Sequence, residues 1–116
     1  SMQDTLEFAT ENMAEMVNLY CAMAYPGSPL HLSAKQQGRR LPVTYSGYSQ
    51  HSYDTLNLAN TNLTSQQILA FRDKAWMGYH TSTKYLDLLE TRFGIAARKN
   101  VEATTKIKLK RKLLGE

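Results

Sequence analysis

Residues 16–24 place the strongest constraint on the fold, because they are apolar on both faces of an extended chain. Successive side chains of a β-strand point to opposite faces. The odd-numbered positions from Val17 to Met23 share one face, the even-numbered positions from Met16 to Ala24 share the other, and both sets are mostly apolar. Such a pattern is typical of a strand inside a parallel sheet. We therefore expect residues 17–24 to form a strand that needs neighbours, and the chain offers few other strands.

A turn and a short helix follow this predicted strand. Pro26 cannot donate to a strand ladder, and Gly27 permits a tight turn. Ser28 and Pro29 suit the N-cap and the first position of a helix. Gly38 suits its C-terminal end. The sequence predicts a helix from Ser28 to about residue 37.

Helical periodicity covers most of the remaining chain. Asp4 and Glu7 predict a capped helix over residues 4–12 or 4–14, with Ser1 set aside as a remnant of tag removal. Residues 64–67 read as a capping box that starts a helix, residues 81–83 interrupt it, and a second helix ends at Gly94. A third helix is predicted from Ile95 to Leu114. Between Gly38 and Leu63 the pattern is irregular and predicts an extended loop.

This loop is rich in tyrosine, and it contains Tyr45, Tyr48, Gln50, His51 and Tyr53. Aromatic rings provide apolar area, while hydroxyl and amide groups fix orientation, so such residues often line ligand sites. Tyrosines lying over an apolar surface would give the same pattern. Both interpretations remain open at this level.

Composition excludes several classes of protein. The 116 residues fit one domain, and the single cysteine, Cys21, cannot form an internal disulfide or hold a zinc ion or an iron–sulfur cluster alone. We expect Cys21 to be a buried thiol. His31, His51 and His80 lack metal-ligand spacing, and the common nucleotide, zinc-protease and hydrolase motifs are missing. No apolar run approaches the roughly 20 residues of a membrane span, and no signal peptide is visible, so a cytoplasmic protein is expected.

The basic residues are unevenly placed. The net charge is +4, and residues 98–112 hold half of the 14 lysines and arginines. A solvated helix face, a nucleic-acid contact and packing against an acidic surface of a parent protein are all compatible with this cluster. Nucleic-acid binding is not favoured, because no aromatic residue is interleaved with the charges.

Several ordered segments resemble one protein family. Residues 18–30, Asn-Leu-Tyr-Cys-Ala-Met-Ala-Tyr-Pro-Gly-Ser-Pro-Leu, resemble the place where a late barrel strand of radical S-adenosylmethionine (radical SAM) proteins runs into a Tyr-Pro-Gly turn. The resemblance continues through Tyr-Ser-Gly-Tyr-Ser-Gln at 45–50, Phe-Arg-Asp at 71–73, Lys-Tyr-Leu at 84–86 and Thr-Lys-Ile-Lys-Leu-Lys-Arg-Lys-Leu-Leu at 105–114. Together they are similar to the C-terminal part of the cobalamin-dependent subgroup, often described as magnesium-protoporphyrin IX monomethyl ester cyclase-like.

The resemblance implies a fragment of a larger enzyme. The family holds a [4Fe–4S] cluster through Cys-x3-Cys-x2-Cys and cobalamin through Asp-x-His, and this sequence contains neither motif. The parent would use S-adenosylmethionine, the cluster and cobalamin for cyclisation or methyl transfer, whereas this chain alone should bind no cofactor and be inactive. Tyr25, Gly27 and Ser28 would then contact cofactor at the barrel mouth.

By the same resemblance, Tyr48, Gln50 and His51 would contact substrate. The expected fold is mainly α with a minor β element, in which the last helix and strand of a partial barrel (residues 1–38) precede the tyrosine-rich loop (39–63) and a C-terminal helical extension (64–116). The expected partner is the missing N-terminal part of the parent, and an exposed strand could also pair two copies. A free-standing basic helical module that binds nucleic acid or protein is the alternative.

Overall fold

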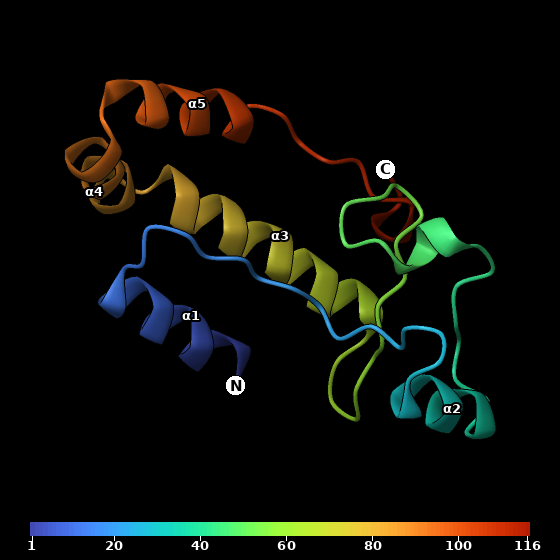
Figure 1. Ribbon diagram of the computed structural model, residues 1–116. Helices are drawn as coiled ribbons and strands as arrows, with labels where there is room; N and C mark the ends of the chain where they lie inside the picture. Colours follow the sequence, from blue (N-terminus) through green and yellow to red (C-terminus); the bar gives the residue numbers. More distant parts are fainter. The chain divides into compact units, whose positions relative to one another are not determined.

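The structure is a computed structural model that describes residues 1–116, and its only regular elements are helices (Figure 1). They are α1 (Met2–Asn12), α2 (Pro29–Gln36), the 3-10 turn η1 (Tyr45–Tyr48), α3 (Ser65–Thr81), α4 (Thr83–Phe93), α5 (Ile95–Thr105) and the 3-10 turn η2 (Lys112–Leu114). The chain packs as two compact units. One comprises Ser1–Leu19 and Asp73–Lys108, and the other comprises Tyr20–Arg72 and Leu109–Glu116.

The expected strand is absent, so the prediction of a minor β element ending a partial barrel is wrong. Residues 16–24 are extended, but no strand is formed anywhere in the chain. Side chains alternate up to Met23, with Cys21 and Met23 buried and Met16 88% exposed, whereas Ala24 on the other face is buried as well. A strand also requires a ladder of backbone hydrogen bonds to a partner strand. The Leu58 N–H donates to the Ala22 carbonyl at 3.0 Å, but no ladder forms.

Two buried tyrosines organise the unit that contains α1, α4 and α5. The hydroxyls of Tyr79 and Tyr85 donate to the backbone carbonyls of Ala14 and Glu15, each at 2.7 Å. These bonds fix the bend of the chain that follows α1. Tyr79, Tyr85 and Leu89 make the core, which is extended by Ala9, Met13, Val17, Ala97 and Val101. Burial raises the pKa of both tyrosines, and their charged forms are disfavoured in the fold.

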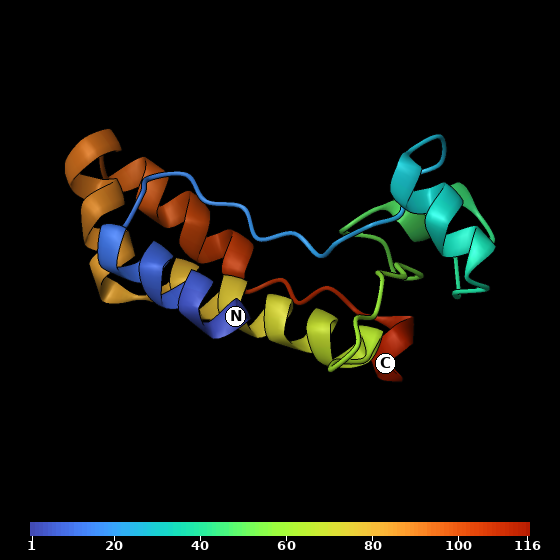
Figure 2. The same cartoon turned by 90° about the horizontal axis from the view of Figure 1, so that it is seen from below.

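Helices α4 and α5 pack against each other, as both views show (Figures 1 and 2). Arg98 of α5 stabilises this contact, because its guanidinium donates to Asp87 at 2.7 Å and to Glu90 at 3.0 Å. It also donates to Glu102 of its own helix at 2.9 Å. These three carboxylates raise the pKa of Arg98 above its ordinary value.

The structure confirms where the sequence places the N-terminal ends of α2, α3 and α4. Ser28 caps α2 by accepting from the His31 N–H at 3.1 Å. Thr64 and Gln67 form the reciprocal capping box of α3, at 3.1 and 2.9 Å. Ser82 caps α4 through the Tyr85 N–H.

Two helix boundaries differ from the prediction. α1 begins at Met2 with Ser1 as its N-cap, and Asp4 is the third helical residue of that capping box, not the cap. α5 ends at Thr105, not at Leu114. Beyond Thr105 the sequence alternates apolar and basic residues with a period of two, and the chain passes at Leu109 into the other unit.

Gly47 and Gly78 differ in how closely other atoms surround them, so alanine substitutions at the two positions form a matched test. An alanine Cβ at position 47 would lie 2.5 Å from the Pro42 Cβ, whereas none of the neighbouring atoms lies within 4 Å at position 78 on α3. We expect Gly47→Ala to lower the free energy of unfolding by about 1–3 kcal/mol through overpacking. Gly78→Ala should raise it by about 1 kcal/mol through helix propensity. Urea denaturation measures both changes, and shifts of the same sign would contradict the described packing.

Candidate functional site

Gln50 joins the tyrosine-rich segment to the Tyr-Pro-Gly segment. Its side-chain oxygen accepts from the Cys21 N–H at 3.0 Å, and its amide donates to the Cys21 carbonyl at 2.9 Å. The same amide lies 3.4 Å from the Tyr25 hydroxyl. Gln50 is buried, and both of its polar atoms are engaged with the chain itself. At Cys21, the Gln50 side chain therefore makes the two backbone hydrogen bonds that a neighbouring strand would make.

Arg111 attaches the C-terminal segment to the same place. Its side chain is fully buried, and one guanidinium nitrogen donates to the carbonyls of Gln50 and Ser52, at 3.0 and 3.1 Å. The N–H groups of Arg111 and Lys112 donate to the Glu116 carboxylate and the Tyr53 carbonyl. Because arginine stays charged and a buried charge needs polar partners, these carbonyls fix where the segment can lie.

Sequence reasoning missed this role of Arg111. It was grouped with the exposed basic residues of the C-terminal cluster, and its burial shows that it cannot meet a nucleic-acid phosphate in this fold. A single sequence gives no sign of which of several neighbouring cations is buried.

The Tyr-Pro-Gly turn has a local structural explanation. Gly27 has φ +86°, which side chains disfavour. The Tyr25 carbonyl accepts from both the N–H and the hydroxyl of Ser28, at 3.1 and 2.6 Å. Gly27 and Ser28 thus form the turn and cap α2, while the Tyr25 ring is about half exposed. Cofactor contact by Tyr25, Gly27 and Ser28 stays a prediction.

The other predicted contact residues each have an aromatic partner within this unit. The Tyr48 hydroxyl lies 3.3 Å from the Nε2 atom of His31. The exposed His51 ring meets Tyr20 edge to face, with ring centroids 6.3 Å apart. Imidazole and phenol side chains can bind polar groups and rings, and histidine can carry a proton near neutral pH. Substrate contact by Tyr48, Gln50 and His51 also stays a prediction.

The chain does not bring together three or more His, Cys, Asp or Glu residues that could hold a metal ion. None of its helices is long and apolar enough to cross a lipid bilayer. Neither a protein-family model nor a curated protein sequence nor a solved structure matches this chain.

The Arg111 contacts predict a large loss of stability on truncation. Arg111→Ala removes a donor from the carbonyls of Gln50 and Ser52 and opens a cavity, so the free energy of unfolding should fall by about 3 kcal/mol. Lys110→Ala, at an exposed neighbour, should change it by less than about 0.5 kcal/mol. Urea denaturation of the two variants makes the comparison. Equal effects would contradict the burial of Arg111.

Proposed function

We propose that this chain is the C-terminal region of a cobalamin-dependent radical SAM protein of the magnesium-protoporphyrin IX monomethyl ester cyclase-like kind. In the parent it covers the mouth of the catalytic barrel and contacts substrate or cofactor. One observation carries the proposal. Cys21, Gln50 and Arg111 come from three separate segments of the resemblance, and hydrogen bonds join them in one unit.

Exposed apolar side chains support a large missing partner. In the unit that holds the candidate residues they include Tyr20, Tyr25, Leu32, Val43 and Tyr45. A protein that binds this unit would cover side chains of this kind. The N-terminal part of the parent is the partner that the resemblance implies. The alternative, a basic module that binds nucleic acid, is weakened because Arg111 is withdrawn from the basic cluster.

The residues of this chain do not fit the cluster of the parent. A [4Fe–4S] cluster is commonly held by cysteine thiolates, and the only cysteine is Cys21, whose backbone is held by Gln50. Radical chemistry on S-adenosylmethionine therefore belongs to the rest of the parent. This chain would bind, orient and shield, with Tyr25 at the cofactor and Tyr48 and His51 at the substrate. Gln50 would act by positioning Tyr25.

The proposal predicts the coding sequence upstream of this segment. An open reading frame should continue in frame and encode Cys-x3-Cys-x2-Cys, because the parent needs that motif for its cluster. Sequencing the gene provides the test. An in-frame stop codon just before this segment, with its own start codon, would overturn the proposal.

Anaerobic reconstitution with iron and sulfide provides a second readout. The full-length protein should acquire the absorbance of a [4Fe–4S] cluster, and the isolated chain should not. Stable cluster absorbance on the isolated chain would contradict the assignment of cofactor binding to the missing part.

A further inference from the structure

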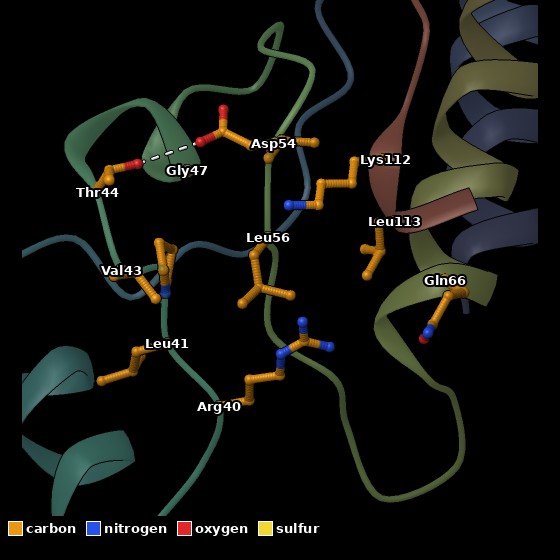
Figure 3. Close-up of a pocket in the computed structure, with 12 residues that line it drawn as sticks. Arg40, Leu41, Val43, Thr44, Gly47, Asp54, Leu56, Gln66, Lys112 and Leu113 are labelled. Atoms are coloured by element: carbon orange, nitrogen blue, oxygen red, sulfur yellow. Dashed lines mark hydrogen bonds between the residues drawn. The ribbon is translucent and has the colours of Figure 1, made fainter. Parts of the chain in front are cut away.

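A cavity of about 420 Å³ lies in the unit formed by Tyr20–Arg72 and Leu109–Glu116, and its lining includes none of the residues that the resemblance assigns to cofactor or substrate contact (Figure 3). Its volume is within the range of small-molecule sites, about 300–1,000 Å³. The apolar part of its wall consists of Leu41, Pro42, Val43, Leu56 and Leu113. Such a wall favours a ligand with an apolar body.

Positive charge is placed at the same cavity. Arg40 and Lys112 line it, and Figure 3 shows the guanidinium and the ammonium group both pointing toward its middle, with Leu56 between them in the view. Both side chains are exposed, so they can meet a ligand that enters from solvent. Cations at the mouth of an apolar cavity favour an anionic ligand.

The one carboxylate of the cavity is already occupied. Asp54 accepts from the Ser46 hydroxyl at 2.6 Å and from the Thr44 hydroxyl at 3.1 Å, the bond drawn in Figure 3. These hydroxyls, Ser46 first, lower the pKa of Asp54. Asp54 therefore stays negative, and its Oδ2 atom accepts both of these hydrogen bonds, so the cavity has two cations and one anion.

We propose that this cavity binds an amphipathic anion, in which a carboxylate or phosphate group meets Arg40 and Lys112 and an apolar body lies against Leu41, Leu56 and Leu113. This site does not depend on the identity of the parent protein. The anionic group gives orientation, and the apolar wall supplies the contact area.

Calorimetric titration of the full chain tests the proposal with four probes: octanoate, octyl phosphate, octanol and inorganic phosphate. At least one of the two amphipathic anions should bind roughly tenfold tighter than octanol and inorganic phosphate, and the tighter of the two identifies the headgroup. Saturable binding that is as tight for octanol would overturn the anionic part of the proposal. A lack of saturable binding by both anions below about 10 mM would overturn the site itself.

Matched variants place the binding in the cavity. Arg40→Gln and Lys112→Gln should each weaken binding roughly tenfold, because each removes one charge-assisted contact. Lys110→Gln removes the same charge from an exposed residue that does not line the cavity, so it should leave binding within about twofold. Equal losses in Lys112→Gln and Lys110→Gln would show nonspecific attraction and overturn the proposal.

Discussion

Burial of the Arg111 guanidinium against the carbonyls of Gln50 and Ser52 is the interaction on which one of the two units depends. It fixes the tyrosine-rich segment, and the Gln50 side chain then takes both backbone groups of Cys21. An extended backbone must satisfy its N–H and C=O groups, and without strand neighbours, side chains can do so. The other unit uses the same principle, since Tyr79 and Tyr85 donate to the carbonyls of Ala14 and Glu15.

Local signals predicted the helices well, because caps act through neighbouring residues. Ser28 and Thr64 cap the helices that the sequence assigned to them, and Ser82 caps the helix that follows the predicted interruption at residues 81–83. The strand prediction was wrong because apolar side chains that repeat every two residues indicate an extended backbone, but they do not show whether another strand pairs with it. Of the candidate site, the sequence selected Tyr25, Gln50 and the aromatic residues of the loop. The burial of Arg111 depends on contacts with residues about 60 positions away in the chain, and no local sequence pattern indicates them.

The proposed function depends on the resemblance, and the structure adds a physical reason why its segments belong together. The Tyr-Pro-Gly turn, the tyrosine-rich loop and the C-terminal basic segment are linked by hydrogen bonds within one unit. Gln50 and Arg111 therefore act as positioning residues, which leaves the exposed rings of Tyr25 and His51 to meet other molecules. The cavity lined by Arg40 and Lys112 is a separate proposed binding site in the same unit.

Hydrogen exchange at the Cys21 amide is the most direct test of whether the Gln50 side chain, fixed by Arg111, holds the extended segment in place of a neighbouring strand. This N–H lies in a segment without strand partners, and Gln50 holds it at 3.0 Å. The account predicts protection of this amide in the unaltered chain, and a roughly tenfold or larger acceleration of exchange in Gln50→Ala and in Arg111→Ala. Rapid exchange in the unaltered chain, or an unchanged rate in both variants, would contradict it.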